Sequence, residues 1–441
     1  MAADVRVRDE DGRFGQLMTT IFALSSGAAP AGIGVIRVSG PQAIAAVTAL
    51  AGTLPPPREA RVRALRDGAG ALLDRALVLL FPGPATATGE DLVELHCHGG
   101  RAVIAAVLQA LGMQPGVRPA KAGEFTRRAL ANGRIDLAEA AGLADLLSAD
   151  TERQRVAALA AAEGLVSQRV RGWLDRLAML SAMVEAQLDF ADEDDVADDA
   201  GALASIIDGK RALCAELAQV LASPPVERLR DGISVVLAGP TNAGKSTLIN
   251  LLSQRELAIV SPIAGTTRDR IEATVARDGV VYVLTDTAGL TDSDDPIERI
   301  GVTRAEGSIA AADVLLWLGD DPPPRSDAMW IHARADAPDR VAVSDRQIAV
   351  AQSDLSSVDG LWRAIAAAAE RLLPRGDAIA FRESERTACR EALAALKDES
   401  ADPLILAEQL RLARRALAMI LGIDATETML DALFGRFCIG K

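Results

Sequence analysis

The chain has 441 residues, of which 49% are hydrophobic, and it carries a formal net charge of −14. This length predicts two to four domains, and the negative charge argues against broad, non-specific binding to nucleic acid. Because no apolar run is long and clean enough to span a bilayer, we expect no membrane segment. Four scattered cysteines without a CxxC pair favour a reducing, cytoplasmic location.

The first part of the chain has the composition of an α+β domain. After a polar lead-in at 1–18, which we expect to be mobile, residues 19–133 mix short apolar runs with Gly and Pro. His96 and His98 are two residues apart on a predicted strand and therefore lie on the same face, so both imidazoles could face one metal ion. With no third ligand evident, a backbone or packing role is favoured.

Two Ala- and Leu-rich segments with helical spacing, 134–228 and 374–441, flank a different region at 229–373. This pattern predicts an all-helical domain that is split by an inserted domain. A switch placed between two halves of one helical domain can bias that domain when its loops order or relax.

The inserted region opens with a phosphate-loop motif. Residues 239–246 fit G-x-x-x-x-G-K-[ST], between an apolar run at 233–238 and a predicted helix. Lys245 would reach the β- and γ-phosphates, Ser246 would ligate Mg²⁺, and the helix N-terminus would add partial positive charge. In this loop we assign nucleotide binding to Asn242, Ala243, Gly244, Lys245, Ser246 and Thr247.

Two more motifs follow in the order of a Ras-like α/β GTPase. Gly265-Thr-Thr-Arg-Asp269 lies where a first switch is expected, and Thr267 would be a second Mg²⁺ ligand. Asp278-Gly279 predicts a hairpin, whose second strand leads to Asp286-Thr-Ala-Gly289. There Asp286 would hold the metal through water, and the Gly289 N–H would contact the γ-phosphate. The predicted nucleotide contacts here are Ser261, Pro262, Ile263, Ala264, Gly265, Thr266, Thr267, Asp286, Thr287, Ala288 and Gly289.

The base-reading loop is altered. Ala333-Arg-Ala-Asp336 stands where a GTPase has Asn-Lys-x-Asp, and residues 351–353 stand in place of the last guanine loop. Asp336 would accept both guanine N–H groups, while the apolar stem of Arg334 covers the guanine face. We expect GTP, bound more weakly than usual. The alternative is that Asp336 is only an acidic residue of a surface loop.

Catalysis needs a substitute for the usual glutamine. Leu290 stands where Ras-type enzymes place a Gln that orients the attacking water. Asn242 could coordinate a monovalent cation beside the phosphates, in the role of an arginine finger, or it could simply brace the loop. The acidic segment 292–298 offers carboxylates. Glu298, where a helix is predicted to begin, is the preferred catalytic residue, and a helix-start role is its alternative.

Together these motifs resemble the potassium-activated GTPases of the TrmE/Era group. Further motifs narrow the resemblance to the MnmE (TrmE) family of tRNA modification GTPases, and it extends from about Thr19 to Lys441. These motifs are Gly32-Ile-Gly-Val-Ile-Arg-Val-Ser-Gly40, Thr88-Gly-Glu-Asp91, His98-Gly-Gly100, Gly123-Glu-Phe-Thr-Arg-Arg-Ala129, Asn132-Gly-Arg-Ile-Asp-Leu137 and Phe437-Cys-Ile-Gly-Lys441.

The resemblance implies potassium-dependent GTP hydrolysis that drives modification of the wobble uridine of certain tRNAs at carbon 5, of the carboxymethylaminomethyl or aminomethyl type. It implies an N-terminal domain that binds 5-formyltetrahydrofolate or a related folate and forms a homodimer. It also implies a flavoprotein partner of the MnmG (GidA) type, using FAD and NADH, in a heterotetramer or larger complex.

Residue by residue, the resemblance assigns ligands as well. The K⁺ cage would consist of Asn242, Ser261, Thr266 and the Ile263 carbonyl. The folate contacts would be Arg37, Glu94, Arg134 and Lys441. Arg134 stands where Lys is expected, and the two differ in donor geometry. Cys438 has either a chemical role near the folate or that of a buried structural thiol.

Local basic groups are the candidates for contact with tRNA, although a solvated helix face is the commoner fate of such runs. These groups are Arg58, Arg61, Arg63 and Arg66, and Arg411, Arg414 and Arg415. Two other functions stay open. One is an Era-like RNA-binding assembly GTPase, and the other is a folate-binding scaffold with weak nucleotide hydrolysis.

Overall fold

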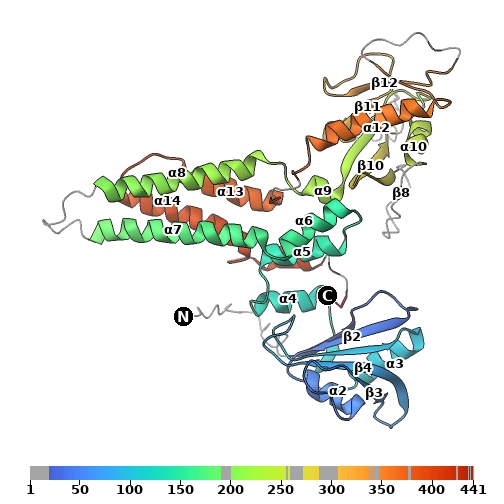
Figure 1. The fold of residues 1–441 in the computed structure, drawn as a ribbon, viewed down its shortest axis with the longest axis vertical. Helices are drawn as coiled ribbons and strands as arrows, with labels where there is room; N and C mark the ends of the chain where they lie inside the picture. The colour runs from blue at the N-terminus through green and yellow to red at the C-terminus, as the bar shows by residue number, and fades with distance from the viewer. Residues whose placement is uncertain are drawn as a thin grey trace, which may run out of the picture. The chain divides into compact units, whose positions relative to one another are not determined.

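The computed structural model describes residues 19–189, 200–254, 257–258, 272–287, 306–337, 340, 347–375, 379–423, 426–435, 437 and 439–440. The chain divides into two compact units, one formed by Met1–Ala144 with Leu421–Lys441 and the other by Asp145–Ile420 (Figure 1). The last residues of the chain therefore belong to the same unit as the first. Within the described residues, no helix has the length and apolar character needed to cross a membrane.

The first unit contains a six-stranded sheet in the order β3-β4-β5-β2-β1-β6. Its neighbours pair antiparallel except β1 and β6, which are parallel. The strands are β1 (Thr20–Leu24), β2 (Ile33–Ser39), β3 (Arg61–Arg66), β4 (Leu72–Phe81), β5 (Leu92–His98) and β6 (Val117–Pro119).

Helices cover both faces of this sheet because the strands alternate their side chains between the faces. Ile36 and Val38 of β2 pack with residues of α2 (Ala43–Ala51) and α3 (Arg101–Gly112) in the larger core. On the opposite face, Ile21 and Ala23 of β1 pack against Phe125 of α4 (Glu124–Ala131). Helices α5 (Leu137–Leu147) and α15 (Glu427–Phe434) come from the two flanking parts of the chain.

The second unit contains a bundle of long helices. In Figure 1, α13 (Glu383–Leu396) and α14 (Pro403–Ala418) run along α7 (Leu165–Asp189) and α8 (Ala200–Ala222), although the sequence between the two pairs forms another domain. Buried side chains join the pairs. Trp173 stacks on Phe381 with 5.8 Å between ring centroids, and buried Lys210 donates to Asp398 O at 2.5 Å and Gln409 Oε1 at 2.9 Å. The shorter α6 (Glu152–Ala162) precedes α7.

The intervening residues form a seven-stranded sheet in the order β13-β12-β11-β7-β10-β9-β8. Five strands are parallel, and β9 and β8 are added antiparallel at one edge. The strands are β7 (Ile233–Ala238), β8 (Leu257–Ala258), β9 (Glu272–Arg277), β10 (Val280–Asp286), β11 (Val314–Trp317), β12 (Met329–Ala333) and β13 (Ile348–Val350).

Helices α9 (Glu227–Asp231), α10 (Lys245–Ser253) and α12 (Leu355–Glu370) accompany this sheet, and Tyr282 and Trp362 meet edge to face in its core at 5.1 Å. The predicted fold class is confirmed: an α+β domain, a helical domain, and a P-loop α/β domain inserted into it. The predicted domain boundaries, at 18/19, 133/134, 228/229 and 373/374, stay predictions.

One connection in this sheet is unusually short. The parallel strands β11 and β12 are joined by residues 318–328, which contain no helix. Parallel neighbours are usually joined by a helical crossover. Here side chains hold the irregular segment: Trp317 Nε1 donates to Asp321 O at 2.7 Å, and Trp330 Nε1 donates to Gly319 O at 2.7 Å.

Candidate functional site

The phosphate loop lies between the end of β7 and the start of α10, as the motif requires. Gly239 has φ 148°, and a Cβ there would lie 3.1 Å from the backbone carbon of Leu318, so a side chain would be strained. Gly244 precedes α10 with φ 97°. Asn242 has φ 64°, a left-handed conformation that Asn tolerates better than most residues. The loop therefore turns three times through backbone conformations that restrict its sequence.

Lys245 is held inside the loop. Its side chain is buried, and Nζ donates to Gly239 O at 3.1 Å and Pro240 O at 2.9 Å. Burial lowers the pKa of this ammonium group, and the nearby Asp286 carboxylate opposes that shift. A lysine side chain aimed into a partly desolvated loop is suited to binding phosphate as a point charge.

Ser246 and Asp286 meet at the adjacent ends of α10 and β10. Ser246 Oγ donates to Asp286 Oδ2 at 2.6 Å. The other oxygen, Asp286 Oδ1, is buried and has no hydrogen-bond partner among the described residues. A hydroxyl beside a carboxylate with an unsatisfied oxygen suits Mg²⁺, which prefers oxygen ligands and usually keeps several waters. The pair that is described therefore fits the predicted metal site.

Thr287 anchors the third motif to the sheet. Its N–H and Oγ1 both donate to Leu237 O, at 3.1 and 2.9 Å, and the side chain is 4% exposed. The contact fixes the end of β10 against the end of β7, directly before the phosphate loop. The other predicted residues of the switch regions lie outside the described residues. These are Ser261, Pro262, Ile263, Ala264, Gly265, Thr266, Thr267, Ala288, Gly289 and the catalytic candidate Glu298, whose roles stay predictions.

The altered base loop lies beside the phosphate loop. Arg334 has φ 57°, and its Cγ and Cδ would lie 3.8 Å from a Cβ placed on Gly244. Asp336 Oδ2 accepts hydrogen bonds from Ser353 N at 3.0 Å and Ser353 Oγ at 2.7 Å. These bonds lower the pKa of Asp336. The structure thus brings together the loops at 333–336 and 351–353, both singled out as guanine loops.

On the N-terminal sheet, Arg37 and Glu94 face each other across β2 and β5. Arg37 Nη2 donates to Glu94 Oε1 at 2.9 Å, and the guanidinium carbon lies 5.9 Å from the centre of the Phe125 ring. His96 Nε2 lies 3.3 Å from Glu94 Oε2. The side chains of Arg37 and Glu94 are 27% and 17% exposed. They therefore present donors and acceptors from a half-buried position.

The remaining folate candidates are distributed differently. Arg134 Nε donates to Thr86 O at 3.1 Å, which places its head beside the loop between β4 and β5. Lys441 and Cys438 lie outside the described residues. Their neighbours contact the first unit: Ser25 Oγ, just after β1, donates to Gly440 O at 2.7 Å, and Ile439 bridges to Ala122, between β6 and α4. The C-terminal signature thus returns to the N-terminal sheet.

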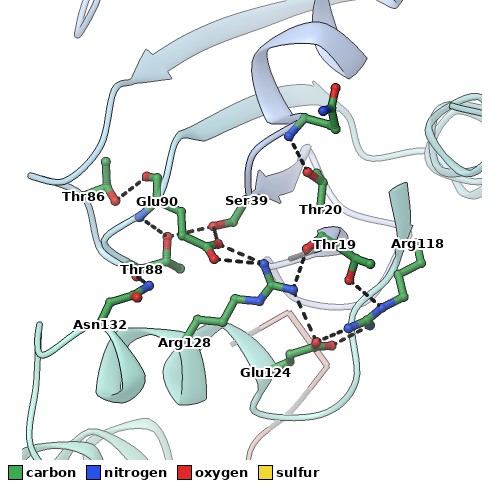
Figure 2. A network of polar contacts seen from close by, with 11 residues as sticks. Thr19, Thr20, Ser39, Thr86, Thr88, Glu90, Arg118, Glu124, Arg128 and Asn132 are labelled. Atoms are coloured by element: carbon green, nitrogen blue, oxygen red, sulfur yellow. Dashed lines mark hydrogen bonds and ion pairs between the residues drawn. The ribbon is translucent and has the colours of Figure 1, made fainter. Parts of the chain in front are cut away.

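The sequence motifs gave no sign of a buried network that joins four of them (Figure 2). Arg128 is 1% exposed, and its Nη1 donates to both Glu90 carboxylate oxygens at 3.1 and 3.0 Å. Its Nη2 donates to Thr19 O at 2.7 Å. Ser39 Oγ also donates to Glu90, at 2.8 Å, and Asn132 Nδ2 donates to Thr88 O at 2.7 Å. The network ties α4, which carries Phe125, to the strands.

The metal interpretation of His96 and His98 has no support in the described part of the chain. No group of three or more His, Cys, Asp or Glu residues is placed there to hold a metal ion. His98 Nδ1 lies 2.7 Å from Asp74 Oδ1, so each imidazole faces a single carboxylate. Cys97 is buried on the opposite face, and burial raises its pKa to about 12. Each histidine therefore makes a local polar contact with one carboxylate, and His98 is 74% exposed, so it is not part of the packed core.

A parallel sheet whose strand ends carry a phosphate loop, a serine–aspartate pair and an Asp-Thr-Ala-Gly motif defines a P-loop nucleotide-binding protein of the GTPase fold. Residues 20–134 match the family described as GTP-binding protein TrmE N-terminus, and residues 137–438 match the MnmE helical domain. The chain therefore belongs to the MnmE family of tRNA modification GTPases.

Curated relatives agree over nearly the full length. The chain is 54% identical to the tRNA modification GTPase MnmE of Erythrobacter litoralis, covering 96% of this chain and 100% of that protein. It is 52% identical to the protein of the same name from Sphingopyxis alaskensis, covering 92% and 100%. A third relative, from Rhizorhabdus wittichii, is 53% identical, with 96% of each chain covered.

Proposed function

We propose that this protein hydrolyses GTP and uses the resulting switch to drive carbon-5 modification of the wobble uridine in certain tRNAs. The observation that carries the proposal is the arrangement of Lys245, Ser246 and Asp286 at the ends of parallel strands, in a chain of the MnmE family. The set supplies a cation for the phosphates and an oxygen site for Mg²⁺.

Hydrolysis would use Mg²⁺ on Ser246 and Thr267, with Asp286 acting through water. A K⁺ ion on Asn242, Ser261, Thr266 and the Ile263 carbonyl would supply the positive charge that stabilises the transition state. Glu298 would position the attacking water, since Leu290 cannot. Asp336, fixed by Ser353, would read guanine.

In the N-terminal domain, we propose a binding site for 5-formyltetrahydrofolate or a related folate. Glu94 can accept from the adjacent N–H donors of a pterin edge, and Arg37 can donate to its carbonyl. The half-burial of this pair and the nearby Phe125 ring support the assignment. The bound folate would supply the one-carbon unit. Arg134 and Lys441 complete the proposed set.

We further propose a cytoplasmic homodimer that works with tRNA and a flavoprotein partner of the MnmG type, which uses FAD and NADH. Membership of the MnmE family supports these assignments. The altered residues Ala333 and Arg334 keep one other function in view, a folate-binding scaffold that hydrolyses nucleotide only weakly.

Turnover of GTP and ATP, measured side by side in K⁺ and in Na⁺, tests the proposal. We expect GTP to be hydrolysed faster than ATP, and K⁺ to raise the GTP rate strongly, because the oxygen cage must match the ionic radius. Equal rates in the two salts would contradict the potassium assignment. Turnover near the uncatalysed rate, with folate still bound, would favour the scaffold.

A further inference from the structure

The short helix α9 belongs to the nucleotide-binding domain on one side. It has five residues, and it joins the bundle helix α8 to strand β7. Leu229 is 5% exposed and packs in the core of the seven-stranded sheet. Arg228 Nε donates to Asp313 Oδ1 at 2.7 Å. One face of α9 is thus fixed to the sheet domain by an apolar contact and an ion pair.

The helical domain holds the other side of α9 through Gln154 of α6. Gln154 is 7% exposed, and its Nε2 donates to Leu229 O at 3.1 Å and Arg230 O at 2.9 Å. Its Oε1 accepts from Thr151 N at 2.9 Å, in the capping box of α6. The side-chain amide of Gln154 therefore caps the N-terminus of α6 and also donates hydrogen bonds to two carbonyls of α9.

The second connection between the bundle and the sheet domain also meets α9. Val226 N donates to Phe381 O at 3.1 Å, just before α9. Glu227 Oε1 accepts from Glu383 N, the first residue of α13, at 2.9 Å. Both chain segments that join the two domains are therefore bonded to each other at this helix.

Asp313 links α9 to the part of the sheet domain that follows the predicted second switch. Residues 306–311 are helical, and Asp313 lies between them and β11. Its Oδ2 accepts from Ser234 N at 3.1 Å, and its own N–H donates to Ser234 O at 3.1 Å. Arg325, from the helix-free crossover, donates to Ile309 O at 2.7 Å and Ala312 O at 3.0 Å. The end of the helical segment is thus held at a defined place.

We propose that α9 is a joint through which a nucleotide-dependent change in the helical segment 306–311, anchored at Asp313, reaches the helical domain, with Arg228 and Gln154 as positioning residues. The inference rests on the proposed nucleotide binding. Arg228 is 39% exposed, and exposed ion pairs contribute little to folding stability. The ion pair matters for position rather than for stability. It joins the end of the helical segment 306–311 to α9, and Gln154 of the helical domain is hydrogen-bonded to α9. Coupling of this kind needs a contiguous set of contacts whose arrangement both sites bias.

Hydrogen exchange on the full chain tests the joint, comparing GDP with GDP–aluminium fluoride in K⁺. In the parent protein we expect the two states to differ in the exchange of α10 and also of α6. In Arg228→Gln the difference in α10 should persist, while that in α6 falls several-fold. Arg155→Gln is the matched control, because Arg155 lies on α6 and, among the residues that the structure describes, pairs with Glu152 of the same helix.

Two further variants distinguish a loss of communication between α9 and α6 from a general loss of stability. Gln154→Glu keeps the oxygen that accepts in the capping box but replaces the donor to α9 with an acceptor, so it should also uncouple α6. Arg228→Lys keeps the charge beside Asp313 and should restore much of the α6 response. A merely structural role would instead lower the melting temperature and leave the nucleotide-dependent difference in α6 intact.

An α6 response in Arg228→Gln as large as in the parent would overturn the proposal. The proposal would also fail if, in the parent protein, nucleotide protects α10 from exchange but the exchange of α6 is the same in the two nucleotide states. That result would leave the proposed function standing. If neither state protects α10, nucleotide binding itself fails, and the joint fails with it.

Discussion

The two loops that we propose to bind the phosphates and the base are held in different ways. At the phosphate side, the glycines of the loop and the Nζ of Lys245 are held by backbone geometry, and Thr287 fixes the neighbouring strand. At the base side, Asp336 is positioned mainly by one serine. A loop whose shape depends on unusual backbone angles tolerates few substitutions. A site that depends on one side chain can lose ligand affinity gradually as its contacts are removed. Variants should therefore cost more at the phosphate side.

Glu298→Ala should give the largest effect on rate. If Glu298 positions the attacking water, kcat for GTP should fall by about 10²–10⁴-fold, the usual scale for a positioned acid–base group, with GTP affinity little changed. Single-turnover hydrolysis in saturating K⁺ measures it. Asp295→Ala is the control from the same acidic segment. Unchanged turnover in Glu298→Ala would leave it as a helix-start residue and move the search to Asp292, Asp294 and Asp295.

Asn242→Ala should come next. Asn242 has a left-handed φ of 64° and an exposed side chain in the phosphate loop. If it ligates K⁺, the variant should lose the preference for K⁺ over Na⁺, with a fall of about 10²–10³-fold in the K⁺ rate, comparable to losing one transition-state contact. Nucleotide binding should weaken much less than the K⁺ rate falls, although Ala is disfavoured at this left-handed φ and will strain the loop. A variant that retains full K⁺ stimulation would return Asn242 to a loop-bracing role.

At the base side, Asp336→Asn should weaken GTP binding by roughly 5–150-fold, because an amide cannot accept both guanine N–H groups. The loss should be specific to guanine, so affinities for GTP and ATP, measured together by calorimetry, form the test. A variant with unchanged GTP affinity would show that the loop at 333–336 is only a surface loop. The double variant with Asn242→Ala then tells whether the two sides are independent, since independent effects add.

Local sequence patterns correctly predicted the parts of this structure whose backbone conformation is set by neighbouring residues. Asp278-Gly279 predicted a hairpin, and both residues have positive φ, 51° and 77°, between paired β9 and β10. The phosphate loop was predictable for the same reason, since its glycines mark special backbone conformations. Its contact with residues 318–319, in contrast, depends on how the sheet brings distant strands together.

Long-range polar contacts could not be predicted in this way. Arg128 and Glu90 lie in separate motifs, 38 residues apart, and neither motif indicates that these two side chains pair. The link from Gln154 to the carbonyls of α9 spans 75 residues and uses backbone acceptors, which leave no trace in the side-chain pattern. The return of Gly440 to Ser25 is of the same kind. Such contacts arise from tertiary packing.

Ser353→Ala should have the smallest effect, and it tests how firmly the Asp336 carboxylate must be held. It removes the Ser353 Oγ bond to Asp336 Oδ2 but leaves the bond from Ser353 N, so the carboxylate keeps one of its two anchors. Because hydrogen bonds to Ser353 lower the pKa of Asp336, losing one should move that pKa back toward its ordinary value. We expect GTP affinity to fall by roughly two- to tenfold, with kcat unchanged.

Ser356→Ala is the matched control, because Ser356 N and Oγ bond Asp354 Oδ1 at 3.0 and 2.7 Å, the same geometry, three residues further along. Its loss should weaken the N-cap of α12 slightly and leave GTP affinity unchanged, since Asp354 is not a predicted base contact. Equal effects of the two variants on GTP affinity would mean that Ser353 acts only through the stability of the loop. A fall confined to Ser353→Ala would show that the base side depends on how firmly one carboxylate is held, which is the weakness that the phosphate side avoids by using its backbone.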